Sequence, residues 1–322
     1  MKKLFKPMSF VKKFCAISHR QLQNETRAAE FIVRIMKQAG ITYTRQYFNT
    51  QIPKFGQAIL WADGKRIPAI TTSFLSGSIS SNHAIVSSLI SSQKFIKEPN
   101  INFNPACAGI SRSNHYFAPS LAIARGDLQK VCQAKRVIGS VRVNLVQHCS
   151  SNIMVGNREN PTFIVFCHYD SISVGAIDNA SGVAVLLDLI INNPKTLKDT
   201  LYVIAGNEEL SYDFPVYWGH GYRVFEKKYD TIMKRAQKIF VVDSLGNGPT
   251  TLFRDSETVR LGFPIVNLVA WQKKIIMLSG DIDGLLSVYH SDLDTLSMLK
   301  EKYLKEATRK LLSLFTTFQH RR

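Results

Sequence analysis

Three short apolar runs in the second half of the chain each lead into charged or polar side chains. They are Phe163–Phe166, Leu201–Ala205 and Ile239–Val242, and they are rich in β-branched and aromatic residues. Continuous apolar runs of this length are typical of strands that are buried on both faces. Apolar positions at helical spacing predict helices at 181–191, within 216–238 and at 296–318. This alternation predicts an α/β fold, a three-layer sandwich around a mixed, largely parallel central sheet.

In the first half of the chain, the residue composition and the hydrophobic periodicity change near residue 52. A helix is predicted at Glu25–Ala39 and a strand at Ile41–Phe48. From about Ile52 to Ala134, Ser, Pro and Gly recur, helical periodicity is weak, and runs such as 58–60 and 121–123 predict short strands. Val137–Val146 alternates like a strand that returns the chain to the main sheet. We therefore predict one discontinuous domain of residues 1–51 and 135–322, interrupted by a small β-rich domain of residues 52–134.

Composition and length are those of an ordinary globular protein, with 322 residues, 45% hydrophobic and 20% charged. No apolar run approaches the ~20 residues that would span a bilayer. The basic N-terminus resembles the start of a signal peptide, but Lys6, Lys12 and Lys13 interrupt the apolar segment that export requires. Five cysteines without CxxC spacing favour a reducing compartment with free, mostly buried thiols. These features predict a cytoplasmic protein without a membrane span.

The formal net charge of +17 raises the question of an anionic partner. Nucleic acid, an anionic membrane and acidic peptides would all be attracted by it. The Lys and Arg residues are scattered, however, and are not interleaved with exposed aromatic residues as a nucleic-acid groove requires. We interpret the charge as a solvated surface and predict no specific nucleic-acid partner. The sequence leaves open whether the chain forms a homo-oligomer.

Charged and polar residues follow the three predicted strands at a spacing that could close a two-metal hydrolytic site. In open α/β sheets, ligands collect beyond the carboxyl ends of the strands. A charge at such a buried position is costly unless it is paired or binds a metal. The candidate metal ligands are His168, Asp178, Glu209, Asp243 and His290, with Glu208 beside Glu209.

The residue types suit that chemistry. Asp170 lies two residues after His168 and could accept the second ring N–H of a metal-bound imidazole. Asp178 occupies a polar turn and could offer one oxygen to each of two metal ions. Because Glu208 and Glu209 are adjacent, one can bind metal while the other reaches the attacking water. Nitrogen and oxygen ligands of this kind suit two Zn²⁺ ions, with Co²⁺ or Mn²⁺ as substitutes.

Together these motifs resemble the zinc aminopeptidases of metallopeptidase family 28, a group that includes the bacterial leucyl aminopeptidases. The resemblance covers roughly residues 152–318. It depends on His168-x-Asp170, Asp178-Asn-Ala-Ser-Gly182, Glu208-Glu209, Asp243-Ser244 and Tyr289-His290-Ser291-x-x-Asp294-Thr295.

The resemblance implies a phosphorylase/hydrolase-like fold and peptide substrates with a free N-terminus. It implies one zinc ion held by His168, Asp178 and Asp243, and a second held by Asp178, Glu209 and His290. Glu208 would be the general base. A protease-associated-type domain would account for residues 52–134.

Two alternatives stay open on the sequence alone. Glutaminyl cyclases, which use a single zinc ion, share this fold and a stretch like Cys167–Ser171. A catalytically inactive binding protein on the same scaffold is the other alternative, although such proteins lose ligands and none is missing here. The chain also departs from many relatives at Leu210–Arg223, a segment expected to shape the specificity pocket.

Overall fold

The computed structural model describes residues 4–89 and 96–319, and the chain divides into two compact units. The first unit comprises Met1–Thr50, His148–Leu285 and Thr295–Arg322, and the second comprises Gln51–Gln147 and Leu286–Asp294. The assignment of residues 52–134 as an inserted domain of the protease-associated type stays a prediction.

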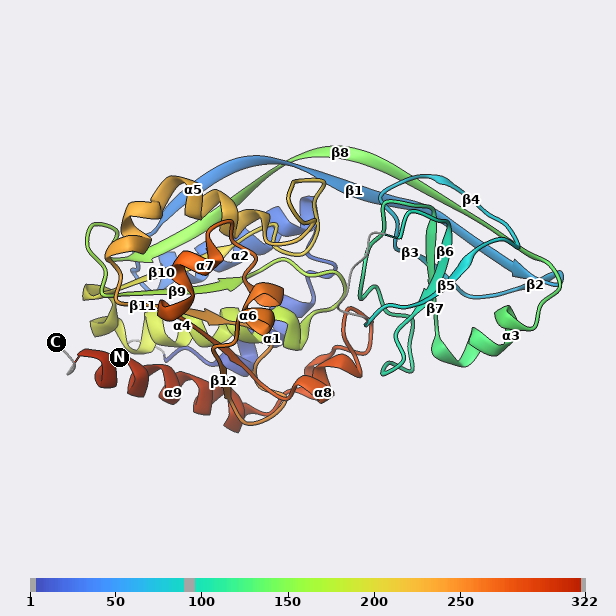
Figure 1. Cartoon of the computed structure of the whole chain (residues 1–322). Helices are drawn as coiled ribbons and strands as arrows, with labels where there is room; N and C mark the ends of the chain where they lie inside the picture. The colour runs from blue at the N-terminus through green and yellow to red at the C-terminus, as the bar shows by residue number, and fades with distance from the viewer. Residues whose placement is uncertain (1–3, 90–95, 320–322) are drawn as a thin grey trace. The chain divides into compact units, whose positions relative to one another are not determined.

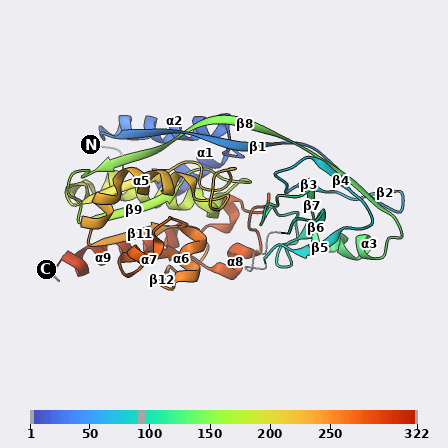
Figure 2. The same cartoon turned by 45° about the horizontal axis from the view of Figure 1, so that its top comes forward.

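A mixed β-sheet forms the centre of the first unit (Figure 1). Its strand order is β12-β13-β11-β9-β10-β8-β1. The four strands from β13 to β10 run parallel, whereas β12 and β8 pair antiparallel at either side. The strands are β1 (Thr44–Ala62), β8 (Val137–Gly156), β9 (Phe163–His168), β10 (Thr200–Ala205), β11 (Lys238–Val242), β12 (Thr251–Phe253) and β13 (Ile275–Ser279). The long neighbours β1 and β8 lie side by side (Figure 2).

Helices cover both faces of this sheet. On one face, α5, α6 and α7 pack against alternate strand residues such as Ile164, Val203 and Val241. On the other face, the ring of Phe315 in α9 stacks on Phe163, with 5.0 Å between centroids. The helices are α1 (Pro7–Cys15), α2 (Gln23–Gln38), α4 (Gly182–Asn192), α5 (His220–Arg235), α6 (Ser256–Gly262), α7 (Leu268–Trp271), α8 (Ile282–Leu286) and α9 (Glu301–Gln319). The predicted α/β fold with a mixed, largely parallel sheet is confirmed.

Several elements differ from their predictions. The run at 58–60 is part of the long strand β1 and does not form a strand of its own. The closing helix begins at Glu301, because a separate 3-10 turn (Leu296–Met298) precedes it. The sequence pattern also missed α1, whose inward face carries Phe10, Val11 and Phe14. The expectation of mostly buried thiols is wrong for Cys132 and Cys149, which are exposed, although the five cysteines form no disulfide.

The second unit contains a four-stranded sheet of order β3-β7-β6-β5. Its apolar core is built around residues such as Leu60, Ile101 and Leu121. A fully buried amide, Asn102, donates to Thr72, Ser120 and other partners within this core. The elements are β2 (Lys65–Arg66), β3 (Ile70–Thr71), β4 (Gly77–Ile79), β5 (Ala84–Ser87), β6 (Asn100–Phe103), β7 (Ser120–Ile123) and α3 (Leu128–Cys132).

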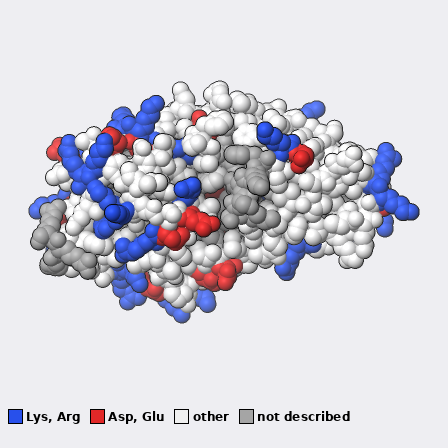
Figure 3. Space-filling model, viewed as in Figure 1, with Lys and Arg blue, Asp and Glu red and all other residues white. Residues whose placement is uncertain are grey.

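The surface bears on the predictions about partners. Within the described residues, no helix has both the length and the apolar character needed to cross a bilayer. On the face shown in Figure 3, Lys and Arg side chains occupy several separate places, with Asp and Glu side chains among them. Interpretation of the net charge as a solvated surface stays a prediction.

Candidate metal centre

The carboxyl ends of three neighbouring parallel strands bring the predicted residues of the first unit together. His168 is the last residue of β9, which pairs with β10 at Ala205 and with β11 along its length. Glu208 and Glu209 follow β10, and Asp243 follows β11 directly. The register therefore places an imidazole between a pair of glutamates and an aspartate. This is the edge at which α/β sheets bind ligands.

His168 lies within reach of three carboxylates. Its Nε2 is 3.1 Å from Asp178 Oδ1 and 3.5 Å from Asp243 Oδ1, and its Nδ1 is 3.5 Å from Asp170 Oδ1. Burial acts to lower the pKa of His168, but the hydrogen bonds with Asp170, Asp178 and Asp243 outweigh it and raise the pKa well above its usual range. One nitrogen that faces two carboxylates marks a position where a positive charge is strongly stabilised.

Asp170 organises the backbone on the neighbouring strand end. One of its carboxylate oxygens accepts the Glu208 N–H at 3.0 Å, and the other accepts the Glu209 N–H at 2.9 Å. The side chain of Asp170 is fully buried. It was predicted only to orient His168. The structure gives it the additional contact with both glutamates, so one carboxylate links the imidazole of β9 to the chain after β10.

A polar turn before α4 carries Asp178, and Asn179 ties this turn to the end of β11. The Asn179 amide donates to the Val242 carbonyl at 3.0 Å, and its oxygen accepts the Ser244 N–H at 3.3 Å. These two partners flank Asp243 in the chain. The Asp-Asn pair thus fixes the spacing between two acidic residues that both face His168.

Glu208 is buried among other acidic groups. Burial raises the pKa of the Glu208 carboxyl well above its usual range, and the nearby charges of Glu209, Asp170 and Asp243 raise it further, while His168 opposes them. A carboxyl in this setting binds a proton more readily than an exposed one does. That property suits a group that accepts a proton from water.

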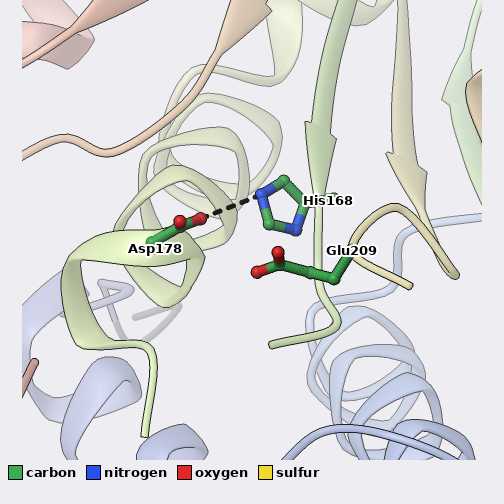
Figure 4. Close-up of side chains that lie close together, drawn as sticks. All are labelled: His168, Asp178 and Glu209. Carbon is green, nitrogen blue, oxygen red and sulfur yellow. Dashed lines mark ion pairs between the residues drawn. The ribbon is translucent and has the colours of Figure 1, made fainter. Parts of the chain in front are cut away.

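Three residues present ligand atoms close enough for a single metal ion. One atom each from His168, Asp178 and Glu209 lies within 4.8 Å of the others, and all three residues are buried. Figure 4 shows the imidazole with Asp178 on one side and Glu209, from the loop after β10, on the other. An imidazole with carboxylates is a donor set that zinc prefers. The residues therefore fit a divalent metal ion.

His290 belongs to the second unit, and its place in the metal centre stays a prediction. Within that unit, its Nδ1 lies 3.1 Å from the carbonyl oxygen of Arg112, and its own carbonyl accepts the Arg112 N–H at 3.0 Å. A carbonyl can only accept, so Nδ1 carries the proton in this contact. Nε2 is then the nitrogen that can bind a metal ion.

Other residues that organise the site could not be predicted from the pattern. Asn179 was part of the quoted motif, but its contacts with β11 depend on chain segments far apart in sequence. Arg20 and Gln21, from the segment between α1 and α2, also reach the site, with Gln21 donating to Asp170 Oδ2 at 3.3 Å. No local signal distinguishes either residue from a surface residue.

Comparisons with known proteins agree with this geometry. Residues 152–259 match the model of peptidase family M28. Among solved structures, the chain is similar to BSAP, a zinc aminopeptidase from Bacillus subtilis, with 18% identity, a TM-score of 0.67 and coverage of 95% of this chain and 94% of that chain. An aminopeptidase from Aneurinibacillus sp. strain AM-1 has 15% identity, a TM-score of 0.59 and coverage of 94% and 92%.

A glutaminyl cyclase from an Acidobacteriales bacterium has 12% identity, a TM-score of 0.52 and coverage of 100% of this chain and 97% of that chain. At these identities the structural likeness shows a shared fold. No curated protein matched the sequence. The family match, which spans β9, β10 and β11, confirms the resemblance to peptidase family M28 that the motifs indicated.

Proposed function

We propose that the chain is a zinc aminopeptidase that removes N-terminal residues from peptides. The observation that carries this proposal is the buried cluster of His168, Asp178 and Glu209, with Asp243 beside it. In the proposed centre, His168, Asp178 and Asp243 would hold one zinc ion, and Asp178, Glu209 and His290 would hold a second. When bound, such ions lower the pKa of a water ligand and polarise the scissile carbonyl.

The chain's own residues supply the proton transfers. Glu208 accepts the proton of the attacking water and passes it to the leaving amine, a role that suits a buried carboxyl with a raised pKa. Asp170 holds Glu208 in place through the backbone and faces the ring nitrogen of His168. Glu208 is therefore proposed to transfer the proton, and Glu209 is proposed to bind the metal.

Metal analysis and a substrate panel test the proposal. We expect two zinc ions per chain, cleavage of aminoacyl fluorogenic substrates, and no cleavage of the same peptides after N-terminal acetylation. Glu208→Gln should keep its zinc but lose about 10²–10⁴-fold in turnover, which is the usual contribution of a general base. Glu257→Gln, at an exposed position in α6, is the matched control and should retain full turnover. Wild-type turnover in Glu208→Gln would remove this residue from the mechanism.

Glutaminyl cyclase activity is the second candidate, because cyclases from an Acidobacteriales bacterium and from Porphyromonas gingivalis share the fold. A peptide with N-terminal glutamine separates the two functions. Ring closure with loss of ammonia, a single zinc ion per chain and no release of free amino acids would favour the cyclase. Zinc binding without turnover of any peptide in the panel would favour an inactive binding protein.

A further inference from the structure

A buried arginine outside the metal centre binds the segment that connects two of its proposed ligands. The segment comprises residues 169–177, which connect His168 to Asp178, and we call it the ligand loop. Arg20 is fully buried. Its Nε donates to the Tyr169 carbonyl at 2.7 Å, Nη1 to the Val174 carbonyl at 2.8 Å and Nη2 to the Gly175 carbonyl at 2.9 Å. One guanidinium thus joins the two ends of the ligand loop.

Backbone and neighbouring contacts make this attachment continuous. The Arg20 N–H donates to Ser171 Oγ at 3.3 Å, and the Ser171 N–H donates to the Arg20 carbonyl at 3.3 Å. The guanidinium carbon lies 4.7 Å from the ring centroid of Phe14 in α1, so an aromatic face covers the charge. All of these residues belong to the first unit. The chain between α1 and α2 is therefore part of the support of the ligand loop.

Gly175 lies between the guanidinium of Arg20 and the turn that presents Asp178. Its φ of +62° favours glycine. A Cβ at this position would lie 2.8 Å from Arg20 Nη2 and 2.3 Å from the Asp178 carbonyl oxygen. Hence no side chain fits between the guanidinium and the turn that presents Asp178. A displacement of Arg20 would be transmitted to that turn.

We propose that Arg20 is a positioning residue that holds the ligand loop in the metal-binding conformation. The inference depends on the proposed metal centre. Removing the fork of donors would take the guanidinium away from three carbonyls, of which that of Gly175 would keep the Ala180 N–H, and the loop would then have to be ordered when the metal binds. Loss of outer contacts to metal ligands typically weakens metal binding 10–100-fold. Because Asp178 is proposed to serve both ions, both affinities should fall.

The test measures zinc dissociation constants by competition with a chromophoric chelator, with thermal unfolding of the metal-free proteins recorded in parallel. Arg20→Met keeps much of the apolar stem but has no donors, and its zinc affinity should fall 10–100-fold. Arg20→Lys keeps a charge and one donor group without the planar fork, so its loss should be smaller. Gly175→Ala places a Cβ 2.3 Å from the Asp178 carbonyl oxygen and 2.8 Å from Arg20 Nη2, so it should displace the turn directly and also weaken zinc binding.

Two controls separate positioning from general destabilisation. Arg27→Met removes an exposed arginine of α2 and should bind zinc as the wild type does. Leu311→Ala empties a fully buried site in α9 and should lower the unfolding temperature without weakening zinc binding. If the wild type binds no zinc, the proposed function fails. If the wild type binds zinc and both Arg20 variants bind it within twofold of the wild type, the positioning role is refuted.

If Arg20→Met does not fold, the decision passes to Arg20→Lys, which keeps the charge but not the planar fork of donors. A zinc affinity in Arg20→Lys equal to that of the wild type would then overturn the proposal. A weaker zinc affinity in Arg20→Lys than in Leu311→Ala would support it, because the two variants then differ in the support of the ligand loop and not in charge.

Discussion

Replacement of Asp170 by asparagine changes a single atom at the contact between β9 and the two glutamates. The carboxylate accepts two backbone N–H groups, one from Glu208 and one from Glu209. Asparagine keeps one acceptor oxygen and turns an NH₂ group toward the other N–H. The variant therefore leaves a buried donor without a partner, and it exchanges a charged hydrogen bond for a neutral one.

The size of the effect follows from those two losses. An unsatisfied buried N–H costs about 1–3 kcal/mol, and the change from a charged to a neutral acceptor costs about 1 kcal/mol. Removal of one negative charge relieves the repulsion with Glu208 but weakens the attraction for His168, so these two charge effects oppose each other. Because the two N–H groups are in direct contact with Asp170, we expect the contact losses to dominate. The free energy of unfolding of metal-free Asp170→Asn should fall by about 2 kcal/mol.

Urea unfolding in the presence of a chelator measures this quantity. Trp271, which is 6% exposed in the same unit, reports the transition by fluorescence. Asp283→Asn, at an exposed position in α8, is the matched control and should leave the transition unchanged. A stability of Asp170→Asn equal to or greater than that of the wild type would show that charge repulsion outweighs the contacts. The two backbone contacts would then not be the main contribution of Asp170 to stability.

Two further changes test the turn before α4 and the start of α5. Asn179→Asp turns a carboxylate toward the Val242 carbonyl in place of a donor. In a urea titration the free energy of unfolding should therefore fall by about 2–3 kcal/mol. An unchanged value would contradict the importance of this hydrogen bond between the turn and β11. Burial lowers the pKa of His220 despite the nearby Asp213, so the folded state favours the neutral ring. The free energy of unfolding should therefore fall as the pH drops below about 6.5, the pKa of this histidine in the unfolded chain. Thermal unfolding between pH 7.5 and 5 should show a weaker pH dependence in His220→Gln, and an identical slope would exclude this contribution.

The sequence predicted the elements that are defined by local patterns. The apolar runs ending at Phe166, Ala205 and Val242 lie in β9, β10 and β11, and parallel pairing then places the residues that follow them at one edge. Asp178 could also be identified, because its turn precedes an apolar helix. These predictions succeed because they need only the strand period and the rule that ligands bind at the carboxyl edge.

Features that depend on distant segments could not be predicted. Arg20 lies in a short connection with no periodicity, and its three carbonyl partners lie in the ligand loop, remote in sequence. The helix α1 was missed because Lys12 and Lys13 suggested an interrupted signal peptide, although Phe10 and Phe14 lie on one helical face. Backbone carbonyls carry no sequence signal, so contacts to them become visible only in three dimensions.

The position of α9 in the chain affects how the protein folds during synthesis. Every other described helix and strand precedes α9, yet Phe315 and Phe318 cover the rings of Phe163 and Phe240 in the central sheet. While the ribosome is still making α9, those rings have no cover, and nascent chains with bare apolar surfaces attract chaperones and one another. Truncation before Glu301 should therefore yield aggregates, even though the ligands of the first unit are all present.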